Sequence, residues 1–116
     1  MQNLEQIRAA KALSPAKNLD RSAVNKLPAM ILGNGLLAAA AFCDAEGGGD
    51  NRHDMKLAMD ATAHHLAHRE LIKTKNHTAK GMIEDLCGRD SIHLQRATSE
   101  ALAFIAYLKR FAPKKD

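Results

Sequence analysis

The residues best suited to metal chemistry are histidines in the middle of the chain. Asp60, His64 and His68 recur every four residues, so a helix would place them on one face. Two histidines at positions i and i+4 can bind one metal ion. No further ligands are marked, and the apolar residues of this segment lie on a different side. We therefore expect a solvated histidine face (His64, His65 and His68), and we keep metal binding through His64 and His68 as an alternative.

Other short motifs resemble parts of enzyme sites but are incomplete. No Lys follows Gly33-Asn34-Gly35 and no strand precedes it, so it matches neither a Walker loop nor a dinucleotide-binding turn. After Gly47–Gly49, the next residue, Asp50, would repel phosphate. His53-Asp54 is the dipeptide of the HD class of metal-dependent phosphohydrolases, but that site needs an earlier histidine, and His53 is the first in this chain. We therefore expect no catalytic site, no metal and no cofactor.

The charge of the chain favours a polyanionic partner. There are 17 Lys and Arg residues against 13 Asp and Glu, a net charge of +4. Residues 1–26 and 89–116 each carry a net charge of +3, whereas residues 27–50 carry −3. Small basic proteins attract nucleic acid, although an excess of this size can also serve solubility alone.

Nothing in the sequence predicts secretion or membrane insertion. The first residues are amphipathic and charged, unlike a signal peptide. The apolar run 27–43 has 17 residues, fewer than the roughly 20 that span a bilayer. Cys43 and Cys87 are too few for a disulfide framework. We expect a cytoplasmic protein with no membrane partner.

The elements that must position these residues are helices. Ala and Leu are abundant and aromatic residues are scarce, which favours an all-α fold. We predict one domain over residues 1–116, a compact bundle of about five to six helices with a flexible glycine-rich loop at 46–51. The expected helices are 2–13, 19–26, 27–43, 52–72, 78–87 and 91–112.

Within helix 27–43, apolar residues cover nearly every face, which indicates a helix buried on all sides. Asn25 is expected to cap it, with Pro28 in the first turn. Gly33 and Gly35 would then let neighbouring helices approach closely, and Asn34 would need hydrogen-bond partners in the core or across a subunit contact.

The last predicted helix carries a basic stripe opposite its apolar one. If it runs unbroken, five basic residues lie within about 100° of one another: Arg89, His93, Arg96, Arg110 and Lys114. Glu100 interrupts the stripe and is placed to pair with Arg96. Such a stripe is either a solvated face or a track for phosphates, with no base-reading residues implied.

Two blocks of sequence resemble one family. The first block is Lys26-Leu27-Pro28, Ile31, Asn34-Gly35-Leu36 and Phe42, and the second is Arg96-Ala97-Thr98, Glu100-Ala101-Leu102 and Leu108-Lys109-Arg110-Phe111. Together they resemble the small subunit of the Cmr (type III-B) CRISPR effector complex. The blocks cover roughly a third of the chain, in the family's order and separation.

The resemblance implies an all-α subunit without catalytic activity. It further implies stacking of several copies along the effector filament, contact with the backbone and large subunits, and a position along the guide RNA–target RNA duplex. The RNA-binding candidates that match the family blocks are Lys26, Arg96, Lys109 and Arg110. Those added from helical geometry are Arg89 and Lys114, and those added from charge are Arg8 and Lys11. The alternative is a small helical DNA-binding regulator, although the start of helix 91–112 offers few base-reading residues.

Overall fold

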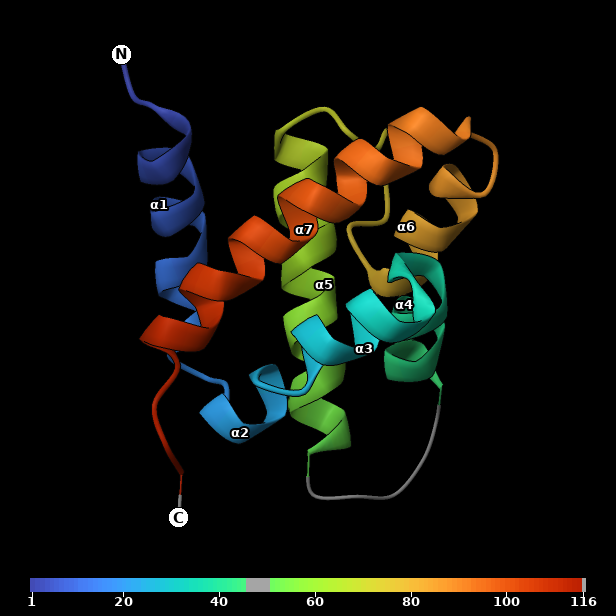
Figure 1. The fold of residues 1–116 in the computed structure, drawn as a ribbon. Coiled ribbons are helices and arrows are strands. Elements are labelled where there is room, and N and C mark those ends of the chain that lie inside the picture. Colours follow the sequence, from blue (N-terminus) through green and yellow to red (C-terminus); the bar gives the residue numbers. More distant parts are fainter. Residues whose placement is uncertain (46–50, 116) are drawn as a thin grey trace.

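Helix α7 (Ser91–Phe111) is the longest element and runs obliquely across α1 (Leu4–Ala16) and α5 (Arg52–His68), as Figure 1 shows. The structure is a computed structural model that describes residues 1–45 and 51–115. Most of the predicted loop 46–51 lies outside the described residues. The shorter helices are α2 (Arg21–Val24), α3 (Leu27–Asn34), α4 (Leu36–Asp44) and α6 (Ala79–Leu86).

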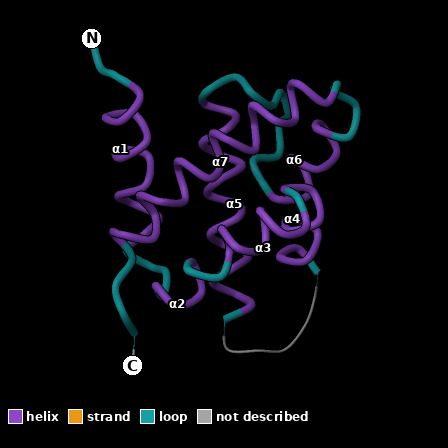
Figure 2. The backbone as a smooth tube through the Cα atoms, viewed as in Figure 1, coloured by secondary structure: helices purple, strands orange, loops and turns teal. Residues whose placement is uncertain are grey.

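The prediction of an all-α bundle is confirmed. Within residues 1–45 and 51–115 the backbone forms helices and connecting loops and no strand (Figure 2). The Cα radius of gyration is 13.1 Å, close to the value of about 13 Å for a compact chain of this length. α4 packs on α6, and α5 contacts α1, α4, α6 and α7, so α5 is the central helix of the bundle.

Several of these helices begin with a residue whose side chain caps the amino-terminal backbone N–H groups. Asp90 caps α7 by accepting a hydrogen bond from the backbone N–H of His93 at 2.8 Å. Thr78 caps α6 in the same way. At α1, Asn3 and Gln6 form a reciprocal capping box, with both bonds at 2.9 Å. These caps satisfy backbone donors that the helices themselves leave unpaired.

The predicted helix 27–43 is wrong, because the chain breaks at Gly35 into α3 and α4. Gly35 has φ +93° and ψ 158°, a conformation that glycine adopts easily and that ends one helix before the next begins. The N-cap also differs from the prediction: Asn25 ends α2, and Lys26 precedes α3, with Pro28 in the first turn as expected. One predicted helix is therefore two helices in the structure, α3 and α4.

The apolar segment is not buried on all sides either. Gly33, Asn34 and Gly35 are exposed, and a Cβ atom added to either glycine would meet nothing within 4 Å. The predicted close packing at these glycines is therefore wrong, and Asn34 needs no partner in the core. Leu32, next to the break, is 75% exposed.

Two other predicted ends shift. α1 continues through Pro15 to Ala16, where Ala12 and Ala16 are fully buried, so packing outweighs the local signal for a stop at residue 13. The predicted helix 52–72 ends at His68, because Glu70 adopts φ +60° and turns the chain away.

The core lies between α7, α5 and α1. Phe104 and Ile105 of α7 are fully buried, together with Met59 and Leu66 of α5. Among the glycines that the structure describes, Gly81 is the one in tight backbone contact, because a Cβ atom added there would collide with the carbonyl oxygen of Asn76. That approach holds the segment before α6 against the helix.

Candidate nucleic-acid interface

Three basic side chains surround one depression at the carboxyl end of α7. The depression has a volume of about 470 Å³ and is lined by Arg21, Ala106, Lys109 and Arg110. Lys109 and Arg110 are exposed on the last turn of α7, whereas Arg21, on α2, is half-buried. Three cations around one hollow form a site that attracts an anion.

Arg21 is positioned by the chain that follows α7. Its Nε donates a hydrogen bond to the carbonyl oxygen of Ala112 at 2.9 Å, and its backbone N–H donates to that of Pro113, also at 2.9 Å. Sequence reasoning did not select Arg21 as a site residue. Arg21 is far from Lys109 and Arg110 in the sequence, so no local sequence pattern indicates that the three side chains lie together.

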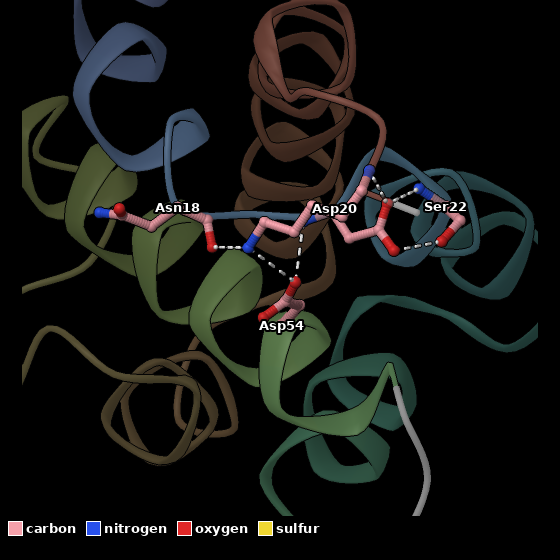
Figure 3. Close-up of polar contacts among 5 residues, drawn as sticks. Asn18, Asp20, Ser22 and Asp54 are labelled. Atoms are coloured by element: carbon pink, nitrogen blue, oxygen red, sulfur yellow. Dashed lines mark hydrogen bonds and ion pairs between the residues drawn. The ribbon is translucent and has the colours of Figure 1, made fainter.

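The same end of the molecule is held by a cluster of polar contacts (Figure 3). Asp54 on α5 accepts a hydrogen bond from the backbone N–H of Asp20 at 2.8 Å. The ammonium group of Lys115 lies 3.9 Å from the Asp54 carboxylate and donates to the carbonyl oxygen of Asn18 at 2.9 Å. Asp20 in turn accepts from Ser22. The Asp54 carboxylate of the His53-Asp54 dipeptide thus has structural partners on the segment before α2 and at the end of the chain.

A second depression lies farther towards the amino end of α7, beside Arg96. It has a volume of about 410 Å³ and is lined by Arg8, Ile92, Gln95, Arg96, Ser99 and Glu100. Arg96 is exposed. Arg96 and Arg110 are two heptads apart, so they share one side of the helix and stand about 21 Å apart along its axis.

Glu100 does not make the predicted pair with Arg96. Its carboxylate instead accepts two hydrogen bonds from the guanidinium of Arg8, from Nε and from Nη2, each at 2.8 Å. The prediction considered only neighbours within the helix, whereas α1 brings Arg8 to the same carboxylate from 92 residues away. Arg8 therefore has a structural partner, and its predicted contact with RNA stays a prediction.

Glu100 has a second partner, His65. The Nε2 atom of His65 lies 2.8 Å from Oε2 of Glu100, the oxygen that also accepts from Arg8 Nε. His65 is fully buried and stacks on Phe104 with ring centroids 4.5 Å apart, so it does not belong to a solvated histidine face. Hydrogen bonding from Arg8 lowers the pKa of Glu100 to about 2 despite its burial. Burial lowers the pKa of His65. The network thus consists of an ionised carboxylate, an Arg cation and a neutral imidazole.

The predicted basic stripe is shorter than expected. Arg89 and Lys114 lie outside α7, so helical geometry does not relate them to Arg96. Arg89 pairs with Asp85 of α6 at 3.3 Å, and the ring of His93 contacts the carbonyl oxygen of Leu71 at 2.6 Å. Of the predicted stripe, Arg96 and Arg110 are exposed on one side of α7, and Lys109 is exposed next to Arg110 on the last turn.

The remaining predicted residues are spread over the molecule. Lys26 is exposed at the start of α3, and Lys11 is half-buried on α1 near His64. The structure leaves each RNA contact assigned from the sequence untested.

Asp60, His64 and His68 do not assemble into a metal site. Asp60 accepts a hydrogen bond from the backbone N–H of Ala79 at 2.8 Å. His64 contacts His77, from the loop before α6, in place of His68. Across the described residues, no group of three or more His, Cys, Asp or Glu side chains is arranged to hold a metal ion. Within the same residues, none of the helices has both the length and the apolar character needed to cross a bilayer.

Fold and surface together define a class: a small basic helical protein with a depression lined by cationic side chains at the end of its longest helix. The family comparison then identifies it. The model of a CRISPR-associated protein family, Cmr5, matches residues 2–114, and the chain belongs to that family. The resemblance to the small Cmr subunit, drawn from two blocks of sequence, is thereby confirmed. Searches of curated proteins and of solved structures each return no match.

Proposed function

We propose that this chain is the non-catalytic, RNA-binding small subunit of a type III-B Cmr effector complex, acting as a single helical domain in the cytoplasm. Membership of the family supports a place in a Cmr complex of CRISPR defence. In the proposal, copies of the chain stack along the filament and contact the backbone and large subunits. Their basic side chains face the duplex of guide RNA and target RNA.

The observation that carries the RNA contact is the depression lined by Arg21, Lys109 and Arg110. Its cations come from two elements, and Arg21 is held by two hydrogen bonds to the segment after α7. The Arg21 side chain suits a phosphate, because the hydrogen bond to Ala112 already restricts it and less of its freedom is lost on binding. Arg96, about 21 Å along the same side of α7, extends the contact to a second phosphate.

Contacts of this kind position a nucleic acid but do not read its sequence. That matches a subunit of an RNA-guided complex, where base pairing with the guide selects the target. It also sets this proposal apart from a DNA-binding regulator, which needs side chains at base edges.

The test is charge reversal at Lys109 and Arg110 in the reconstituted complex. The double variant K109E/R110E should fold as the wild type does, because both side chains are exposed, and should weaken retention of RNA by about tenfold or more in moderate salt. The matched control, K75E/K80E, changes the same amount of charge at exposed positions in the loop before α6 and in the first turn of α6. It should bind RNA as the wild type does.

If both double variants lose RNA retention equally, net charge alone matters. If neither loses it, Lys109 and Arg110 do not contact RNA and the proposal is contradicted. A gel-shift experiment on the isolated chain addresses the rival. Preference for one duplex DNA sequence would contradict the proposal.

A further inference from the structure

His64 and His77 form an imidazole pair that the proposed function does not use. Their Nδ1 atoms lie 3.0 Å apart, and their ring centroids 5.1 Å apart with planes inclined at 60°. Both residues are exposed. His64 stands on α5, and His77 stands in the loop that leads into α6.

The backbone around the pair is held in place on both sides. Asp60, one helical turn before His64, accepts the N–H of Ala79, two residues after His77, at 2.8 Å. On the other side, the close approach of Gly81 to the carbonyl of Asn76 packs the residue before His77 against α6. The two imidazole rings therefore face each other because contacts of neighbouring residues, and not only the contact between the rings, hold the two segments together.

The two facing nitrogens have the separation that one metal ion requires. An ion about 2.0–2.1 Å from both nitrogens separates them by about 2.9 Å at a right angle and about 3.4 Å at the tetrahedral angle. The observed 3.0 Å falls between these values. Without an ion, the same two nitrogens can share only one proton, because one must donate and the other accept.

We propose that His64 and His77 together bind one first-row divalent transition-metal cation, through the Nδ1 atom of each ring. Water completes the coordination. Both rings are exposed, so water can reach the ion, and a depression of about 430 Å³ lies on the α1 side of His64, lined also by Lys11, Ser14 and Pro15. The Lys11 ammonium is a nearby positive charge that weakens binding. Asp60 and His68 are the ionisable side chains one helical turn before and after His64 on the same side of α5.

This site is independent of the RNA interface, which lies on α7. It also differs from the metal alternative considered from the sequence. That alternative joined His64 to His68 by helical spacing, whereas the tertiary structure joins His64 to a residue of another segment.

The experiment is calorimetric titration of the full chain, free of any histidine tag, with Ni²⁺ and separately with Zn²⁺. We expect one ion per chain, with affinity reduced about tenfold or more in H64Q and in H77Q. The matched controls are H53Q and H68Q, which remove exposed histidines of α5 and should leave the affinity unchanged.

Thermal unfolding gives a second readout. Added Ni²⁺ should raise the melting temperature of the wild type and of H53Q but not that of H77Q, since only a folded site binds the ion. The proposal is overturned if H64Q and H77Q bind as tightly as the wild type. It is equally overturned if H53Q or H68Q loses as much affinity, because binding would then be shared among surface histidines.

Discussion

Arg8 and Glu100 form a two-point ion pair that joins the first helix to the last: Nε and Nη2 of the guanidinium each lie 2.8 Å from a different carboxylate oxygen. The side chains are 24% and 10% exposed. Bidentate geometry and partial burial make this pair stronger than an ordinary surface ion pair.

Replacement of Arg8 by Met should therefore destabilise the protein by about 2–3 kcal/mol, because Glu100 would keep its charge with one partner fewer. Chemical denaturation measures the effect. R96M is the matched control and should change the free energy of unfolding by less than about 0.5 kcal/mol, since Arg96 is exposed. A larger loss in R96M than in R8M would restore the pairing predicted from the sequence.

Stability should fall as the solution is acidified. The pKa of Glu100 is about 2 in the folded protein, below its ordinary value of 4.5. The unfolded chain therefore takes up the proton first, and the stabilisation present above pH 4.5 is lost as the pH falls towards 2. The lowered pKa of His65 acts in the same direction, beginning below 6.5. Urea midpoints measured across this range should drop less steeply in E100Q, and an equal slope in both proteins would contradict the assignment.

The two glycines of the Gly33-Asn34-Gly35 stretch should respond oppositely to alanine. Gly35→Ala should cost about 1–3 kcal/mol, because its φ of +93° is unfavourable for a residue with a Cβ atom. Gly33→Ala should be neutral or stabilise by up to about 1 kcal/mol, since Gly33 lies in α3 with open space around it. Thermal melts of the two variants decide the matter. Loss of stability in Gly33→Ala would revive the close-packed helix predicted from the sequence.

The two thiols should differ in reactivity. Cys43 is buried, and burial raises its pKa to about 11, so little thiolate forms at neutral pH. Cys87 is exposed at the end of α6. Alkylation of the native protein followed by mass spectrometry should label Cys87 alone, and both residues should react after unfolding in urea. Labelling of native Cys43 at the rate of Cys87 would show that α4 opens readily.

Properties encoded by neighbours along the chain could be predicted without a structure. The scarcity of strand-forming runs predicted an all-α fold, and Pro28 was placed correctly in the first turn of its helix, because propensities and terminal preferences act within a few residues. The two blocks around Asn34-Gly35-Leu36 and Leu108–Phe111 were sufficient to indicate the family. Each of these signals is local, so each can be read from the sequence alone.

Only the tertiary structure decided which distant residues meet. Helical spacing predicted that Glu100 pairs with Arg96 and that His64 lies beside His68. In the structure, Glu100 pairs with Arg8 and His64 contacts His77, both from other segments. Arg21 joins Lys109 and Arg110 for the same reason. A helical period gives the direction of a side chain on its own helix, whereas its partner depends on how whole helices pack, and packing is set by the combined burial of many apolar residues.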